Sequence, residues 1–171
     1  TFPYRSKKYN ETREMGIKWL AEAKSKYNIP IITEVMEEKF LPLVCEVADI
    51  IQIGSRNMQN YPFLIACAKT NKPLMLKRHY GSSLRDWLGA AEYILKNGNK
   101  KLILCERGVV APHTHKITSR FLIDLQVVPA AQDITHLPII VDPSHATFWR
   151  PWVKSMALAS VASGADGIMI E

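Results

Sequence analysis

The chain has 171 residues, of which 47% are hydrophobic and 22% are charged, and it carries a formal net charge of +6. This composition is typical of a folded globular protein and excludes a disordered chain. No apolar run approaches the roughly 20 residues that span a bilayer, and the opening TFPYRSKK lacks the apolar segment of a signal peptide. We therefore expect one domain over residues 1–171 that resides in the cytoplasm and binds no membrane.

Helical and strand patterns alternate from residue 11 to the last residue. The amphipathic stretches predict helices over residues 11–28, 38–48, 59–70, 83–98, 118–126 and 151–163. Short β-branched runs predict strands over residues 29–36, 49–55, 73–78, 101–107, 138–144 and 167–171. Gly98 stands at the usual C-cap position of its helix. This alternation with apolar strands predicts a parallel sheet covered by helices, which is either a doubly wound sheet or a barrel.

Polar side chains stand at the ends of all the predicted strands. They are Thr33 and Glu34, Gln52 with Arg56 beyond it, Lys77 and Arg78, Glu106 and Arg107, Asp142 to His145, and Glu171. A doubly wound sheet brings its ligand mainly to one crevice, whereas a barrel brings the carboxyl end of every strand to one mouth. The sequence also lacks a GxGxxG or Walker A glycine loop. We therefore favour an α/β fold of the (β/α)8 barrel type.

The cations at these strand ends suggest an anionic ligand. Several cations in one cleft need internal ion pairs or a bound anion, and arginine binds carboxylate and phosphate with two hydrogen bonds. A substrate with both groups therefore suits Arg56, Lys77 and Arg107, and Lys77 can also donate a proton. The alternatives are a solvated strand end at Lys77-Arg78 and an ion pair of Arg107 with Asp124 or with neighbours of Glu106. Nucleic acid is disfavoured because the basic residues are scattered along the chain.

The segment IIVDPSHATFWR, residues 139–150, ends an apolar strand with an acid, a proline and a histidine. Such an ending is either a plain turn or part of a site at the carboxyl end of a parallel strand. His145 and Glu171 belong to the last two predicted strands, so in a barrel they would be neighbours able to share a divalent metal ion. The alternative is a hydrogen-bonded histidine beside an exposed glutamate.

Six segments of the chain resemble one enzyme family. They are IIQIGSRNMQN (50–60), PLMLKR (73–78), LILCERG (102–108), DLQVVP (124–129), LPIIVDPSHAT (137–147) and SGADGIMIE (163–171). In this order they resemble 3-deoxy-D-arabino-heptulosonate 7-phosphate (DAHP) synthases of the short β-type branch. That branch is related to 3-deoxy-manno-octulosonate 8-phosphate (KDO8P) synthases, and IGSRNMQN favours the DAHP side.

The resemblance implies a TIM barrel and a transferase activity. The implied reaction is an aldol-like condensation of phosphoenolpyruvate with erythrose 4-phosphate that releases phosphate, at the entry to the shikimate pathway of aromatic amino acid biosynthesis. The implied partners are these small molecules, with neither nucleic acid nor membrane, and we expect a homo-oligomer. The alternatives are a KDO8P synthase-like enzyme and a non-catalytic phosphate-binding remnant of the family.

The resemblance also implies roles for individual residues. By position, the substrate-binding residues would be Glu34, Arg56, Lys77 and Arg107. The catalytic residues would be Lys77, as general acid, and Glu106. His145 and Glu171 would be two of four ligands to a divalent metal ion of the manganese, iron, cobalt or zinc type.

The chain departs from the family pattern at both ends. Family members begin with two further strands, which supply a cysteine ligand and a Lys-Pro-Arg-Thr motif whose last residue would be Thr1 here. They also continue beyond Glu171 to an aspartate ligand and a last helix. We therefore expect a barrel without its first two strands and its last helix.

Other departures lie near the expected mouth. Bulky His79, Phe148 and Trp149 stand where the family has smaller or different residues, and we expect them to narrow the opening. His113 and His115, in a lengthened loop, are either replacement metal ligands or exposed histidines.

Overall fold

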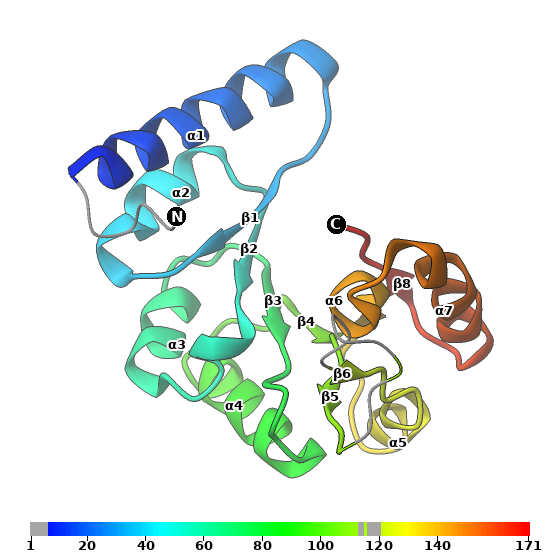
Figure 1. The fold of residues 1–171 in the computed structure, drawn as a ribbon. Coiled ribbons are helices and arrows are strands. Elements are labelled where there is room, and N and C mark those ends of the chain that lie inside the picture. Colours follow the sequence, from blue (N-terminus) through cyan, green and yellow to red (C-terminus); the bar gives the residue numbers. More distant parts are fainter. Residues whose placement is uncertain (1–6, 113–114, 116–120) are drawn as a thin grey trace.

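Six parallel strands form the centre of this computed structural model, which describes residues 7–112, 115 and 121–171 (Figure 1). The strands are β1 (Ile32–Val35), β2 (Ile50–Ile53), β3 (Leu74–Lys77), β4 (Leu102–Glu106), β7 (Ile139–Val141) and β8 (Gly167–Ile168). Their order in the sheet is β1-β2-β3-β4-β7-β8, and every neighbouring pair is parallel. The six predicted strands are therefore confirmed.

Seven α-helices accompany the strands in the described part of the chain. They are α1 (Lys7–Tyr27), α2 (Leu41–Val47), α3 (Tyr61–Ala68), α4 (Leu84–Lys96), α5 (Val127–Gln132), α6 (Pro143–Thr147) and α7 (Arg150–Ala162). Short 3-10 turns cover η2 (Glu38–Phe40) and η3 (Ser55–Asn57). No helix in the described ranges has the length and apolar character needed to cross a membrane.

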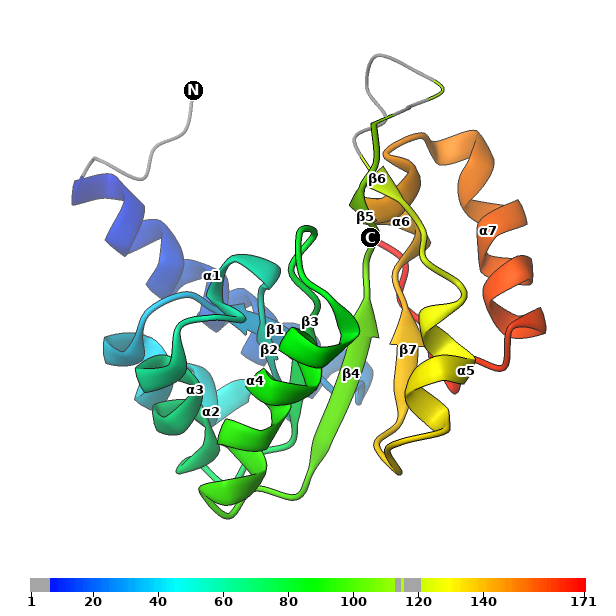
Figure 2. The same cartoon turned by 90° about the horizontal axis from the view of Figure 1, so that it is seen from below.

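The strand order follows the chain without a reversal. A doubly wound sheet reverses its order at one point and carries helices on both faces. Here α2, α3, α4 and α5 all contribute to one apolar core on a single face of the sheet, as Figures 1 and 2 show. A parallel sheet that grows in one direction under one layer of helices is the wall of a (β/α) barrel. The fold is therefore of the predicted barrel type.

Strand alternation separates an apolar face from a polar one. Leu74, Leu76 and Leu104 face the helices and belong to the buried core. Between these rows, the strand register aligns Glu34 with Gln52, and Lys77 with Cys105. Since successive side chains of a strand point to opposite faces, this second face carries Glu34, Gln52 and Lys77.

The predicted helix over residues 118–126 is wrong where the structure describes it. Phe121 and Leu122 form the short strand β6, which pairs antiparallel with β5 (Val109–Val110), and α5 begins only at Val127. Residues 116–120 lie outside the described residues, as do Thr1 and His113. Strand pairing in this two-stranded ribbon depends on contacts distant in the sequence, which local periodicity does not report.

The ends of two other predicted elements also differ. The strand expected over residues 138–144 stops at Val141, because the Asp142 side chain accepts a hydrogen bond from His145 N and caps α6. The last predicted strand is limited to Gly167–Ile168. Gly98 comes just after Asn97, the C-cap residue of α4, and has a φ of +94°, so the helix ends at this glycine as predicted.

Candidate active site

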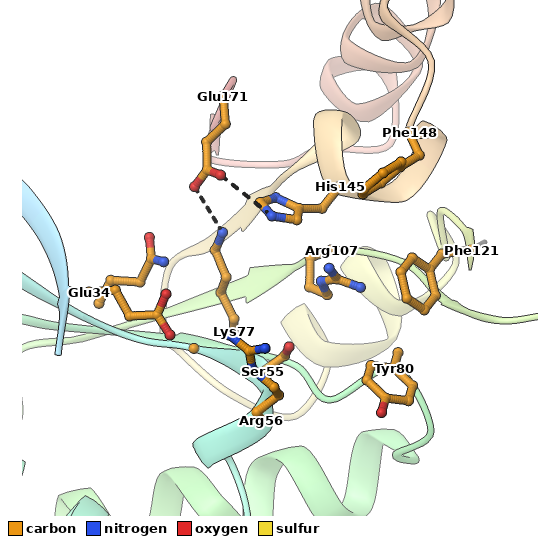
Figure 3. A pocket seen from close by; sticks show the side chains of 12 residues that line it. Glu34, Ser55, Arg56, Lys77, Tyr80, Arg107, Phe121, His145, Phe148 and Glu171 are labelled. Atoms are coloured by element: carbon orange, nitrogen blue, oxygen red, sulfur yellow. Dashed lines mark hydrogen bonds and ion pairs between the residues drawn. The ribbon is translucent and has the colours of Figure 1, made fainter. Parts of the chain in front are cut away.

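A pocket lies at the carboxyl ends of the strands, and Figure 3 shows its side chains. Its lining residues are Glu34, Gln52, Gly54, Ser55, Arg56, Lys77, Tyr80, Arg107, Phe121, His145, Phe148 and Glu171. The expected convergence of strand ends is therefore observed, since every predicted site residue except Glu106 lines this pocket.

Lys77 ends β3 and its ammonium group is held by two carboxylates. Lys77 Nζ donates to Asp142 Oδ2 at 2.9 Å and to Glu171 Oε1 at 3.2 Å, while the Lys77 side chain is only 4% exposed. Burial disfavours the charged form, but the charges of Asp142 and Glu171 outweigh it and raise the pKa of Lys77. Lys77 is therefore a buried, protonated group facing the pocket and not a solvated strand end.

Asp142 orients the imidazole of His145. Asp142 Oδ2 lies 2.7 Å from His145 Nδ1, and Asp142 Oδ1 accepts from His145 N at 3.0 Å. Although burial opposes ionisation, hydrogen bonds from His145 and the charge of Lys77 lower the pKa of Asp142. An ionised Asp142 keeps the imidazole proton on Nδ1, which leaves the Nε2 lone pair directed away from Asp142.

His145 and Glu171 form a donor set suitable for a metal ion. His145 Nε2 lies 3.4 Å from Glu171 Oε2, and one ligand atom from each of Asp142, His145 and Glu171 lies within 4.8 Å of the others. Because Asp142 Oδ2 already bonds Lys77 and His145, we interpret Asp142 as the orienting partner and the other two as ligand candidates. An imidazole and a carboxylate fit a first-row divalent ion.

The sequence analysis named Asp142 at a strand end but did not predict that it orients His145. Its spacing to His145 is the available signal, because an aspartate three residues before a histidine and followed by proline is typical of a capped helix start. A capped turn of this kind holds both side chains in one place.

Glu34 and Arg56 occupy the β1–β2 side of the pocket. Gly54 follows β2, and a Cβ atom there would overlap Glu34 Oε1, so the absent side chain makes room for the Glu34 carboxylate. The η3 turn begins immediately after Gly54 and brings exposed Arg56 to the rim.

Arg107 lies on the other side, against an aromatic wall. Its guanidinium Cζ is 4.4 Å from the ring centre of Phe121, and the rings of Phe121 and Tyr80 are 5.4 Å apart. Figure 3 shows Arg107 between this wall and Lys77, with Phe148 near His145. The alternative partner named for Arg107, Asp124, has its carboxylate 2.7 Å from Arg78 Nη1.

Glu106 is placed differently from expectation. It follows Cys105, which shares a row with Lys77, so alternation turns Glu106 to the helix-facing side and away from the pocket. Its fully buried carboxylate accepts from Arg78 at 3.1 Å and from Gly108 N at 2.6 Å. Burial raises the pKa of Glu106, and Arg78 opposes this rise. The expectation that Glu106 lines the pocket is therefore corrected.

The bulky residues near the mouth divide into two groups. Phe148 lines the pocket as expected, with a left-handed φ of +51°. His79 instead packs on Tyr80 at 4.1 Å, and its Nδ1 accepts from Gly81 N. His79, Trp149 and exposed His115 are not among the described lining residues of this pocket.

Comparison with known proteins finds a family whose pattern matches most of the chain. Residues 11–171 match the DAHP synthetase I family. The chain is 44% identical over 158 residues to a phospho-2-dehydro-3-deoxyheptonate aldolase of Thermotoga maritima, covering 92% of this chain and 46% of the relative. It is 33% identical over 165 residues to a 2-dehydro-3-deoxyphosphooctonate aldolase of Acinetobacter baylyi, covering 92% of this chain and 57% of the relative.

A solved structure gives the same relationship. The fold matches a truncated form of 3-deoxy-D-arabino-heptulosonate 7-phosphate synthase from Thermotoga maritima with a TM-score of 0.85 and 44% identity. The match covers 92% of this chain and 58% of that chain. The chain thus spans about half the length of the curated relatives described above.

Proposed function

Since the chain belongs to the DAHP synthetase I family, we propose that its pocket condenses phosphoenolpyruvate with erythrose 4-phosphate to give DAHP and phosphate. The observation that carries this proposal is the gathering of Arg56, Lys77 and Arg107 beside the His145–Glu171 pair in one pocket. Three cations suit a substrate with a phosphate and a carboxylate. The 44% identical relative from Thermotoga maritima supports the DAHP reaction over the KDO8P reaction.

The cations bind the first substrate in this proposal. Arg107 is 8% exposed and Lys77 is 3% exposed, so their charges act in a partly dry environment where they attract anions more strongly than in water. Exposed Arg56 at the rim completes the set. Glu34 lines the pocket opposite Arg107 and limits where a second anion can lie, because carboxylates repel anions.

His145 and Glu171 would hold a divalent metal ion of the manganese, iron, cobalt or zinc type. When bound, the ion supplies Lewis-acid polarisation of the aldehyde oxygen of erythrose 4-phosphate. Asp142 fixes the His145 ring for this task by holding the proton on Nδ1.

Lys77 supplies the proton in the proposed mechanism. The methylene carbon of phosphoenolpyruvate forms a bond to the aldehyde carbon, and the aldehyde oxygen takes a proton from Lys77 Nζ. The oxygen of a water molecule adds to C2 of phosphoenolpyruvate, and the C2–O bond to phosphate then breaks to leave a ketone. One proton of this water restores Lys77 and the other leaves with the phosphate. The carboxylates of Asp142 and Glu171 keep Lys77 protonated before the reaction, which suits a general acid.

Glu106 has a positioning role in this proposal. Its carboxylate accepts hydrogen bonds from Arg78 and from the backbone N–H of Gly108. It therefore fixes the backbone at Glu106 and Gly108, the residues before and after Arg107. We further propose that residues 1–171 belong to one catalytic domain of a cytoplasmic homo-oligomer whose partners are its small-molecule substrates.

The test is the loss of phosphoenolpyruvate absorbance by the full-length protein with manganese, with and without erythrose 4-phosphate. Loss that requires the aldose and stops with a chelator supports the proposal. Loss with only a five-carbon aldose phosphate would indicate an eight-carbon product, as in the KDO8P branch. No loss in a folded sample would mean a non-catalytic phosphate-binding remnant.

A further inference from the structure

Arg107 and Arg78 both follow buried strands, but their surroundings differ. Arg78 donates to the carboxylates of Glu106 and Asp124 and, from Nε and Nη2, to Ser82 O. Its hydrogen-bonding edge is therefore occupied by the protein. Arg107 makes a cation–π contact, with its guanidinium Cζ 4.4 Å from the centre of the Phe121 ring. An aromatic ring covers one face of the guanidinium plane without competing for its in-plane N–H donors.

The β5–β6 ribbon brings Phe121 to this position. Gly108 begins the turn into the ribbon with a φ of +93°, and a Cβ there would lie 2.9 Å from Phe121 Cβ and 3.0 Å from Ala146 Cα. Only glycine fits this conformation and this space. The ribbon can therefore approach the end of α6 closely, with the Phe121 side chain turned toward Arg107 (Figure 3).

A second contact holds the ribbon from the β3 side. Val110 N donates to Tyr80 O at 2.8 Å, and the Tyr80 ring packs against the Phe121 ring. Tyr80 lies in the loop between β3 and α4, so the position of Phe121 is set by three separate segments. All three aromatic or cationic side chains, Tyr80, Phe121 and Arg107, line the pocket.

We propose that Phe121 is a positioning residue that holds the Arg107 guanidinium ready for the anion of the substrate. This inference rests on the proposed function, because it takes the anion to be phosphoenolpyruvate. Stacking restricts the rotamers of Arg107 and excludes water from one face of its charge. Both effects lower the cost of binding an anion at the N–H edge. Phe121 itself touches no reacting atom in this proposal.

The experiment is calorimetric titration of phosphoenolpyruvate into the manganese-loaded, full-length protein. Phe121→Ala is expected to raise the Kd on the order of tenfold, the loss of one partly desolvated cation–π contact. Phe121→Leu keeps apolar bulk without the ring, so its Kd should lie between those of the wild type and Phe121→Ala. Phe121→Tyr keeps a ring and should have the wild-type Kd. In steady-state assays Phe121→Ala should raise KM and leave kcat nearly unchanged.

Leu122→Ala is the matched control, because Leu122 is the next ribbon residue and is exposed. It should bind phosphoenolpyruvate like the wild type. Equal Kd values for wild type and a folded Phe121→Ala variant would overturn the inference and leave the proposed function standing. Equal weakening by Leu122→Ala would overturn it too, since the whole ribbon would then matter. A wild-type protein that binds no phosphoenolpyruvate would overturn both.

Discussion

Lys77 and Arg78 are neighbours in the chain, yet they enter two different networks on opposite faces of the sheet. Arg78 is enclosed with Glu106 and Asp124 on the helix side, where its Cζ also lies 5.9 Å from the ring of Trp87. Lys77 joins Asp142 and Glu171 on the pocket side, where the Glu171 side chain is 44% exposed. The first network is closed by protein groups, whereas the second can exchange a partner for a ligand.

This difference separates structural charges from functional ones. A buried ion pair is costly to break because the remaining charge has no water to solvate it. Lys77 is buried as well, but it lines the pocket beside the half-exposed Glu171 side chain, so a bound substrate can reach it and its loss should affect chemistry more than folding. Substitutions on the two sides should therefore change different measured quantities.

The largest effect is expected from Arg78→Ala. It leaves the fully buried Glu106 carboxylate without its cation, so the free energy of unfolding should fall by about 3–5 kcal/mol. Urea unfolding followed by circular dichroism measures this. Arg85→Ala removes an exposed arginine from α4 and serves as the control. If both variants unfold at the same urea concentration, the closed network does not stabilise the fold.

Lys77→Ala should show the reverse profile. Turnover of phosphoenolpyruvate should fall roughly 10²–10⁴-fold with the loss of the proton donor. The free energy of unfolding should fall less than in Arg78→Ala, because Asp142 keeps two hydrogen bonds from His145. Lys96→Ala, at an exposed pair with Glu92, is the control. Full turnover in Lys77→Ala would remove Lys77 from the mechanism.

Asp142→Asn tests the orientation of His145. The amide no longer fixes the proton on His145 Nδ1, so affinity for manganese should fall on the order of 10–100-fold. Calorimetric titration of the metal measures it, and Asp133→Asn makes the same charge change at an exposed site outside the pocket. Unchanged metal affinity would show that Asp142 serves folding alone.

Backbone strain is also found on the pocket side. Phe148 has a φ of +51°, and the residue is 43% exposed. Phe148→Gly and Phe148→Ala both remove the ring, but only glycine adopts this φ freely. The glycine variant should therefore be more stable than the alanine variant by about 1 kcal/mol in urea unfolding. If the alanine variant were the more stable of the two, backbone strain at residue 148 would not limit the stability of the fold.

The smallest effect concerns Asp49, which precedes β2 at the amino edge of the sheet. Hydrogen bonds from Lys24 Nζ and Ile31 N lower its pKa below the usual 3.8. The Asp49 carboxylate therefore binds a proton less readily in the folded state than in the unfolded state. This difference stabilises the fold at pH values above the usual pKa, and the stabilisation is lost as the pH falls through the lowered pKa. The stability difference between wild type and Asp49→Asn should shrink between about pH 6 and about pH 3. A difference independent of pH would contradict this ion pair.

Sequence patterns predicted the barrel and most of the pocket because both follow from local rules. Alternating helices and strands give the parallel sheet, and Arg56, Lys77 and Arg107 reach one mouth because parallel strands end at the same edge. The same alternation separates Lys77 from Arg78 and Arg107 from Glu106, although the sequence analysis took each pair together. Strict use of the two-residue period would have predicted the position of Glu106.

The aromatic wall was less accessible to sequence reasoning. Phe121 lies far along the chain from Tyr80, and their contact depends on a ribbon of two residues per strand. The close passage at Gly108 depends on Ala146, a residue of another element. Such contacts are decided by tertiary packing, whereas helical or strand periodicity needs longer segments to be visible.

The unreversed strand order also shapes how the chain folds. Each strand of the sheet pairs with the strand that precedes it in the sequence, with one exception. β7 pairs with β4, and the β5–β6 ribbon and α5 lie between these two strands in the chain. Closing this longest connection in the sheet carries the largest loop-closure entropy, so it should be the late step in assembly. Strands β1 to β4 can thus pair with one another before β7 adds the His145 side of the pocket.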